Sequence, residues 1–330
     1  MSGYHHIAVL GAGAWGTALA NCAARAGRRV TLWSRDKARA AMLAQCRENP
    51  RLPGIPLQAS VSTTAAPQDV ADADAVLIAV PAQAVRAVAE GFGGFLRERI
   101  PVVACAKGIE RSTGLFMTEV IGQCLPQAEA AILSGPSFAH DVGSGLPTAV
   151  TLAAEHAATS GALAGALGTP TFRLYHSTDR RGVEIGGAVK NVLAIAAGIV
   201  QGRALGASAV AALTTRGFAE LSRFGRSYGA RPETLTGLSG LGDLILTCSS
   251  EASRNFSFGL RLGRGLTLAQ ACREGELVEG RFTAGMITAH ALRRGIDMPI
   301  VVAVTAVLDQ RLSIEAAMES LLARPLRSEH

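Results

Sequence analysis

Lysine is nearly absent from this chain. Its 330 residues include 32 lysines and arginines, but only Lys37, Lys107 and Lys190 are lysines, which leaves 32 − 3 = 29 arginines. Arginine keeps its proton near neutral pH, whereas a desolvated lysine can release it. Each remaining lysine is therefore a candidate for chemistry. An arginine-rich composition with structural ion pairs is the alternative explanation of the same counts.

Other features are also scarce, and each scarcity argues against a class of protein. Aromatic residues make up 5% of the chain, too few for the stacking platforms that bind single-stranded nucleic acid. Basic residues form no run of five or more, so we expect no nucleic-acid partner. The net charge of +6 suits an anionic small substrate, and it equally suits a soluble protein with a slight arginine excess.

The six cysteines and seven histidines lack the spacing of a metal site, so we expect no metal. No C-x-x-C pair occurs, which in a chain of this length indicates free thiols in a reducing compartment. Residues 7–24 carry no charge, but glycines interrupt the run and no Lys or Arg precedes it. This pattern differs from a signal peptide or a membrane span. We expect a cytoplasmic protein without a membrane span.

Short apolar runs alternate with helical patterns in the first half of the chain, which is typical of a parallel α/β sheet. The predicted strands are residues 7–10, 29–33, 75–79, 102–106, 130–133, 149–152 and 171–175, and the first helix is 17–26. Beyond Asp179 the sequence is rich in Ala and Leu at helical spacing. We predict a dinucleotide-binding α/β domain at 1–179 and an all-helical domain at 180–330.

The motif Gly11-Ala-Gly13-Ala-Trp-Gly16 follows the first predicted strand and opens the first helix. The first glycine permits a tight turn, the second lets the backbone approach a pyrophosphate, and the third allows close helix–strand packing. The helix N-terminus then presents N–H groups to the phosphates. A glycine-rich turn without a ligand is the alternative, but the placement favours a dinucleotide site.

The second predicted strand ends in Trp33-Ser34-Arg35-Asp36, where a dinucleotide-binding domain contacts the ribose. An acid here binds the ribose diol of NAD, whereas an arginine accommodates the 2′-phosphate of NADP. Ser34 and Arg35 favour NADP, and Asp36 keeps NAD open. A solvated charge at a strand end is the alternative for Arg35. Lys37 begins a charged helix and is expected at the surface.

Lys190 is the only charged residue in the stretch 185–200. A helix that is apolar on all sides is buried, and a buried ammonium has a lowered pKa and needs a partner. Asp243 is the only charge in residues 237–249, with Thr247 one helical turn later, and it is the expected partner. A catalytic lysine and a structural ion pair are both open interpretations of Lys190.

Polar turns follow two further predicted strands. Lys107 follows the strand at 102–106, and the turn Gly135-Pro-Ser137-Phe-Ala139 follows the strand at 130–133. Ligands of open α/β sheets bind outside the carboxyl ends of the strands. We therefore expect Lys107 beside a ligand, and His140, next to the second turn, is a weaker candidate.

The segment Ser253-Arg254-Asn255 combines a helix-capping side chain with a cation and an amide donor. These groups suit a phosphate monoester. An ordinary cap followed by a surface arginine is the alternative. The turn at Leu277-Val-Glu279 carries one acid and by itself says little.

Together these segments resemble the bacterial type of NAD(P)-dependent glycerol-3-phosphate dehydrogenase. The matching motifs are Gly11-x-Gly-x-Trp-Gly16, Cys105-Ala-Lys107-Gly108, Ser134-Gly-Pro-Ser-Phe-Ala139, Gly187-Ala-Val-Lys190-Asn191, Gly240-Leu-Gly-Asp243 and Ser253-Arg-Asn255. Their order and spacing match from Ile7 to about Pro299. The resemblance implies a Rossmann-type domain, an all-helical C-terminal domain of the 6-phosphogluconate-dehydrogenase kind, and a homodimer.

The resemblance also implies roles for particular residues, with Lys190 as the catalytic lysine. It places substrate contacts at Lys107, Gly135, Ser137, Lys190, Asp243, Ser253, Arg254 and Asn255. Cofactor contacts are implied at Ala14, Trp15, Arg35, Lys107, Ala139, Arg254, Leu277 and Glu279, beside Gly11, Gly13 and Gly16 of the glycine motif. One segment departs: the family often has an aromatic before Leu-Pro-Gly, where this chain has Arg51, so the resemblance leaves the role of Arg51 open.

The implied activity is that of an oxidoreductase. It would reduce dihydroxyacetone phosphate reversibly to sn-glycerol 3-phosphate with NADPH or NADH, and thereby supply phospholipid synthesis. Lys190 would donate the proton, Asp243 would orient Lys190, and Arg254 would hold the phosphate. One alternative is a β-hydroxyacid or 6-phosphogluconate-type dehydrogenase, against which the segments 253–255 and 240–243 argue. Another is a nucleotide-sensing module, which would not need a buried Lys190.

Overall fold

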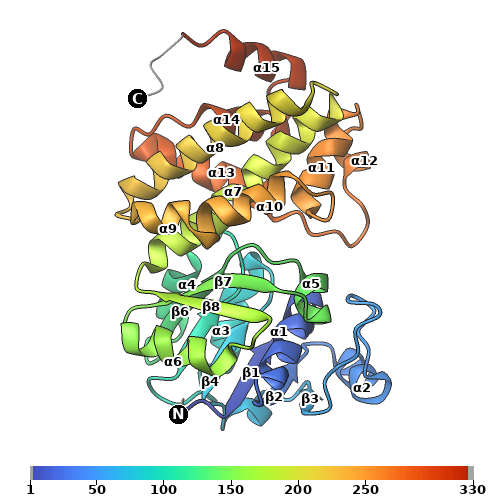
Figure 1. Ribbon diagram of the computed structural model, residues 1–330, viewed down its shortest axis with the longest axis vertical. Coiled ribbons are helices and arrows are strands. Elements are labelled where there is room, and N and C mark those ends of the chain that lie inside the picture. The colour runs from blue at the N-terminus through green and yellow to red at the C-terminus, as the bar shows by residue number, and fades with distance from the viewer. Residues whose placement is uncertain (1–2, 326–330) are drawn as a thin grey trace.

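The protein consists of a region built on one β-sheet and a region built of helices (Figure 1). The computed structural model describes residues 3–325, so the outer ends of the two predicted domains, residues 1–2 and 326–330, lie outside the described part. Strand β8 ends at Ser177 and helix α7 begins at Arg180. We call residues 3–177 the sheet region and residues 180–325 the helical region.

The sheet has eight strands in the order β3-β2-β1-β4-β5-β6-β7-β8. Its first six positions follow the strand order of dinucleotide-binding domains. The strands are β1 (His6–Leu10), β2 (Arg29–Trp33), β3 (Val61–Thr64), β4 (Ala75–Ile78), β5 (Pro101–Ala104), β6 (Glu129–Ser134), β7 (Thr148–Ala154) and β8 (Phe172–Ser177). All pairs are parallel except β6–β7, which is antiparallel.

The strands predicted from the sequence all exist, and β2 has the predicted bounds. Strand β3 was not predicted. It is an edge strand of sequence VSTT in which only Val61 is fully buried, so it lacks the apolar run that marks the inner strands. The antiparallel direction of β7 was also not predicted.

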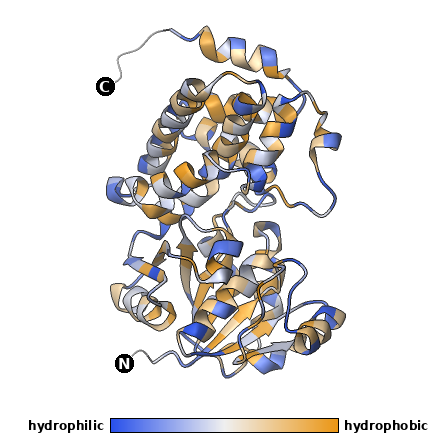
Figure 2. Ribbon diagram, turned by 45° about the vertical axis from the view of Figure 1, so that its right-hand side comes forward, coloured by the Kyte–Doolittle hydropathy of each residue, from blue (hydrophilic) through white to orange (hydrophobic). Residues whose placement is uncertain are grey.

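Helices cover both faces of the sheet because successive strand residues point to opposite sides. Ile7 and Val9 of β1 pack on the side of α1, and Ala8 and Leu10 pack on the side of α3. These helices are α1 (Ala14–Arg25), α2 (Lys37–Cys46), α3 (Val85–Phe92), α4 (Met117–Cys124), α5 (Ala139–Ser144) and α6 (Ala157–Leu167), with short 3-10 turns η1 (Pro67–Val70) and η2 (Ala82–Ala84). Figure 2 shows that the strands between them are predominantly hydrophobic.

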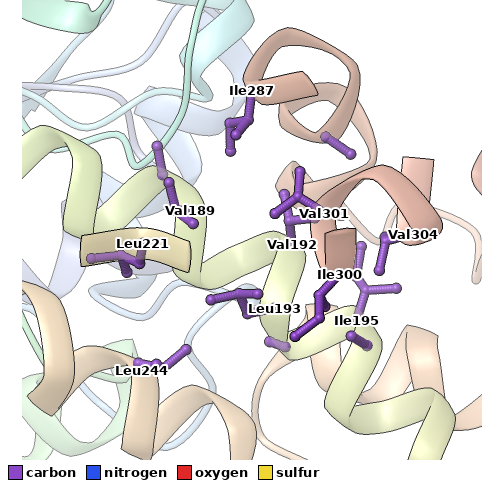
Figure 3. Packing of buried hydrophobic residues seen from close by; sticks show 14 of the residues in the cluster. Val189, Val192, Leu193, Ile195, Leu221, Leu244, Ile287, Ile300, Val301 and Val304 are labelled. Atoms are coloured by element: carbon purple, nitrogen blue, oxygen red, sulfur yellow. The ribbon is translucent and has the colours of Figure 1, made fainter. Parts of the chain in front are cut away.

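The helical region is organised around α7 (Arg180–Gly202), which starts beside the sheet and runs into the middle of the other helices (Figure 1). Its apolar residues pack against α8, α10, α13 and α14 in one core (Figure 3). The remaining elements are α8 (Ala207–Ser227), α9 (Pro232–Thr236), the π-helical turn η3 (Leu238–Gly242), α10 (Asp243–Cys248), α11 (Arg254–Gly263), α12 (Leu268–Ala271), α13 (Glu279–Arg293), α14 (Pro299–Leu308) and α15 (Ile314–Leu322).

Helix α7 is the one helix among residues 3–325 whose length and composition would allow it to cross a membrane, and its apolar window is entirely buried inside the protein. Such burial is typical of a core helix. All six cysteines are free thiols.

Candidate active site

Lys190 lies in the middle of α7 and is buried despite its charge. Its Nζ donates hydrogen bonds to Asp243 Oδ1 at 2.9 Å and to Thr247 Oγ1 at 2.7 Å. Burial lowers the pKa of Lys190 to about 8. The charge of Lys107 also lowers this pKa, whereas the charge of Asp243 raises it. The ammonium can therefore lose and regain a proton near neutral pH.

Asp243 is the first residue of α10 and joins two lysines from different regions of the protein. Its Oδ2 accepts a hydrogen bond from Lys107 Nζ at 2.7 Å, and its Oδ1 accepts the bond from Lys190. Burial alone would raise the pKa of Asp243, but the charges of Lys107 and Lys190 hold it below the ordinary value. Asp243 is thus a carboxylate that holds two ammonium groups side by side.

Lys107 reaches this carboxylate from the end of β5, in the sheet region. Its Nζ also donates to the carbonyl oxygen of Gly135 at 2.7 Å, in the turn that follows β6. Gly135 has φ +148, and a Cβ there would lie 2.8 Å from Val150 Cα, so the turn requires glycine. Ser137 Oγ donates to the same carbonyl at 3.0 Å.

A chain of amide hydrogen bonds runs beside the lysines. Asn191 Nδ2 donates to the carbonyl of Lys107 at 3.0 Å, and Asn255 Nδ2 donates to Asn191 Oδ1 at 3.0 Å. Asn255 Oδ1 in turn accepts from Gly280 N at 2.9 Å. The sequence did not identify Asn191 as a site residue. The available signal was its polar side chain directly after Lys190 in an apolar helix.

Arg254 and Glu279 lie at the beginnings of two helices near this chain. Ser253 Oγ caps α11 by accepting from Phe256 N at 3.3 Å, and Arg254 follows it with an exposed side chain. Glu279 Oε1 accepts from Ala82 N of the sheet region at 3.2 Å, while Glu279 Oε2 is buried without a partner. Burial raises the pKa of Glu279, and the charge of Arg254 opposes this.

The glycine motif has the backbone that its spacing predicts. Gly11 has φ +121, and a Cβ on Gly16 would lie 1.8 Å from the carbonyl oxygen of Gly11. A Cβ on Gly13 would meet nothing within 4 Å, so this side of the turn is open. Gly13 caps α1 without a side-chain hydrogen bond, and the N–H groups of the first turn, which begins with Ala14 and Trp15, have no intrahelical acceptors. The turn therefore fits a pyrophosphate.

After the end of β2, the side chain of Asp36 caps helix α2. Its Oδ1 accepts from Ala38 N at 2.9 Å and from Arg39 N at 3.2 Å, which caps α2. Arg35 is exposed just before it, and Ser34 is buried. Because its carboxylate is engaged at the helix end, Asp36 is less available for a ribose diol than the sequence alone suggests.

The structure joins five of the predicted residues by direct hydrogen bonds: Lys190, Asp243, Lys107, Gly135 and Ser137. Asn255 joins them through Asn191. Ala139 begins α5 and Leu277 is half-buried just before α13. His140 is exposed, and its Nδ1 lies 3.9 Å from Asp141 Oδ1. Lys37 is exposed in the first turn of α2, as the sequence predicts.

Comparison with known proteins covers nearly the whole chain. Residues 6–160 match the family model of the NAD-dependent glycerol-3-phosphate dehydrogenase N-terminus, and residues 179–319 match that of its C-terminus. The chain is 61% identical to "Glycerol-3-phosphate dehydrogenase [NAD(P)+]" of Azorhizobium caulinodans over 330 residues, which is 100% of both chains. It is 61% identical over 329 residues to the protein of the same name from Bradyrhizobium sp. strain BTAi1, again over 100% of both. A crystal structure of glycerol-3-phosphate dehydrogenase from Coxiella burnetii superimposes with a TM-score of 0.92 at 38% identity, over 97% of this chain and 99% of that one.

Proposed function

The chain belongs to the NAD-dependent glycerol-3-phosphate dehydrogenase family, and from this premise we propose that it reduces dihydroxyacetone phosphate reversibly to sn-glycerol 3-phosphate with NADPH or NADH. The observation that carries the proposal is that Asp243 pairs with the buried Lys190 of α7 and with the half-buried Lys107, which follows the carboxyl end of β5. Ligands of open α/β sheets bind at this edge. A substrate bound there would lie beside two ammonium groups, one of which, that of Lys190, can donate a proton.

The glycine motif is the proposed dinucleotide site, with contacts from Gly11, Gly13, Ala14, Trp15 and Gly16. Bound NAD(P)H supplies the hydride. The further proposed cofactor contacts are Arg35, Lys107, Ala139, Arg254, Leu277 and Glu279. NADP is favoured over NAD because the carboxylate of Asp36 caps α2 while the Arg35 side chain is exposed.

Lys190 is the proposed general acid in reduction and the general base in oxidation. Negative charge develops on the carbonyl oxygen as the ketone is reduced, and an ammonium beside that oxygen stabilises the charge and donates the proton. The lowered pKa of about 8 keeps both protonation states of Lys190 accessible near neutral pH. Asp243 and Thr247 hold the ammonium in position through the 2.9 Å and 2.7 Å hydrogen bonds.

The substrate phosphate is proposed to bind at the start of α11. Arg254 is exposed there, and the first turn of the helix carries its positive dipole end. Asn255 Nδ2 has a second N–H beyond the one that it donates to Asn191. Lys107, Gly135, Ser137 and Ser253 complete the proposed set. Binding the phosphate away from the reacting carbon would align the substrate.

We also propose that the domains divide at 179/180. Asp179 supports this boundary because its Oδ1 caps α7 by accepting from Gly182 N at 2.8 Å, directly after the last strand. Family membership supports a homodimer, a cytoplasmic location and a role in supplying phospholipid synthesis.

A substrate and cofactor screen tests the activity. The purified chain should oxidise NADPH, followed by its nicotinamide absorbance, when dihydroxyacetone phosphate is added. It should not do so with a 3-keto acid. Turnover of the 3-keto acid alone would indicate a β-hydroxyacid dehydrogenase, and binding of the nucleotide without turnover of either substrate would indicate a nucleotide sensor.

A further inference from the structure

Three arginines belong to the segments that follow β2: the turn before α2, the first turn of α2, and the loop after α2. Arg35 precedes the cap of α2, Arg39 lies in the first turn of α2, and Arg51 belongs to the loop that follows this helix (Figure 1). Arg39 and Arg51 form hydrogen bonds through their backbone N–H groups, to Asp36 Oδ1 and Asn49 Oδ1. Within residues 3–325, none of the three guanidinium groups has a hydrogen-bond or ion-pair partner.

Arg39 and Arg51 are close enough for one charge to act on the other. Burial, followed by the charge of Arg39, lowers the pKa of the Arg51 guanidinium. Arginine nevertheless keeps its proton at neutral pH. Two positive charges held near each other repel, and an anion bound between them would turn this repulsion into attraction.

The two carboxylates nearest to these arginines in the sequence each accept hydrogen bonds from backbone N–H groups through one oxygen. Asp36 Oδ1 caps α2, and Glu48 Oε1 accepts a hydrogen bond from Gly54 N at 2.8 Å. Among residues 3–325, neither of these carboxylates forms an ion pair with Arg35, Arg39 or Arg51, so their positive charges are open to a bound anion.

The loop that carries Arg51 is fastened to the glycine motif itself. Asn49 is fully buried, and its Nδ2 donates to the carbonyl of Ala12 at 3.2 Å and to Thr17 Oγ1 at 2.6 Å. Its Oδ1 accepts from Arg51 N at 3.0 Å. A single buried amide thus fixes the backbone of Arg51 relative to the turn that fits the pyrophosphate.

We propose that Arg39 and Arg51, together with Arg35, form one binding site for the 2′-phosphate of NADP and so determine cofactor specificity. The inference rests on the proposed dehydrogenase function and deepens it, because it names the groups that select NADP over NAD. A phosphate monoester near neutral pH carries close to two negative charges, and guanidinium groups match it with charge-assisted hydrogen bonds.

Binding of nucleotide fragments tests this 2′-phosphate binding site without requiring turnover. Isothermal titration calorimetry would compare adenosine 2′,5′-bisphosphate with 5′-AMP on the full chain. Arg39→Ala and Arg51→Ala should each weaken binding of the bisphosphate on the order of tenfold. Binding of 5′-AMP should stay within about twofold, because 5′-AMP lacks the 2′-phosphate.

Arg173→Ala is the matched control. Arg173 is an exposed arginine on β8, at the sheet edge opposite to β3, so its removal changes the net charge equally. It should change neither affinity. Unchanged affinity for the bisphosphate in both Arg39→Ala and Arg51→Ala would contradict the proposed 2′-phosphate site. An equal loss of affinity for both nucleotides would contradict it as well. A wild-type protein that binds neither fragment would instead contradict the proposed dinucleotide function.

Discussion

At the scale of single residues, the ammonium group of Lys190 lies between Asp243 Oδ1 and Thr247 Oγ1 in a buried helix. Burial and the hydrogen bonds act on its pKa in opposite directions, and burial prevails. Asp243 balances the second ammonium of Lys107 as well. Because removal of one partner from a buried ion pair leaves a charge uncompensated, substitution of Asp243 should affect folding as well as catalysis.

Arg254 provides a test of the substrate phosphate site. Arg254→Ala should weaken binding of dihydroxyacetone phosphate by on the order of 1.5–3 kcal/mol, since one charge-assisted contact is lost. Steady-state kinetics should show this as a raised KM for the ketone, and inorganic phosphate should compete with substrate in the wild type. Arg264→Ala, an exposed arginine at the other end of α11, is the control. An unchanged KM in Arg254→Ala would remove Arg254 from the site.

Arg35 provides a test of cofactor preference by kinetics. Arg35→Ala should raise KM for NADPH far more than KM for NADH, because only NADPH carries the 2′-phosphate. The Arg173→Ala variant should leave both values unchanged. If the two cofactors are affected equally by Arg35→Ala, Arg35 does not distinguish between them.

Single residues were predictable from the sequence where a charge stood alone. Lys190 and Asp243 are isolated charges in apolar segments, and their pairing followed from the need of each for a partner. The bond from Lys107 to Asp243 could not be predicted, because it depends on how the sheet region packs against the helical region. Asn191 was missed because its neutral amide, although polar within an apolar helix, carries no charge that needs a partner.

At the scale of elements, the sequence predicted the inner strands through their apolar runs but not their partners. Strand β3 was not predicted because the residues after Val61 are polar, as an edge strand allows. The antiparallel pairing of β6 with β7 was not predicted, because strand direction depends on the path of the connecting chain and not on the composition of the strand.

The packing of α7 against α11 depends on glycines that allow two backbones to touch. A Cβ on Gly198 would lie 2.1 Å from Phe256 O, and a Cβ on Gly259 would lie 2.1 Å from Ile195 O. Real side chains do not fit at such distances, so the two helices could not come this close with alanine at either position.

Gly259→Ala should therefore lower the free energy of unfolding by about 1–3 kcal/mol, as overpacking typically does. Urea denaturation followed by circular dichroism measures this change. Gly285→Ala is the control of opposite sign, because a Cβ at Gly285 in α13 would meet nothing within 4 Å. Alanine there should be neutral or stabilising by up to about 1 kcal/mol. Equal stability of Gly259→Ala and the wild type would contradict the close contact.

At the scale of the whole molecule, the proposed site exists only where the two regions meet. The sheet region contributes Lys107 and Gly135, and the helical region contributes Lys190 and Asp243. Further hydrogen bonds hold the regions together. Thr118 N donates to Glu184 on α7 at 2.7 Å, and His290 Nε2 donates to the carbonyl of Gly114 at 2.8 Å. Both regions are thus needed to assemble the site around Asp243.

Lys190 is the proposed proton donor in reduction and the proposed proton acceptor in oxidation. Lys190→Ala should lower kcat by at least about a hundredfold, since general acid–base catalysis contributes about 10²–10⁴-fold. Calorimetry should show that this variant still binds NADPH, because the glycine motif is unchanged.

The pH dependence of kcat/KM, measured in both directions for wild type and Lys190→Arg, is the sharpest test of this role of Lys190. Reduction needs the ammonium form, so wild-type kcat/KM should be level at lower pH and fall as the pH rises through about 8. Oxidation needs the neutral amine, so kcat/KM in that direction should rise through about 8. Lys190→Arg should remain impaired throughout, because arginine keeps the charge but does not release the proton. A Lys190→Arg enzyme that works at near wild-type rate would show that Lys190 is an electrostatic anchor and that the proton comes from another group.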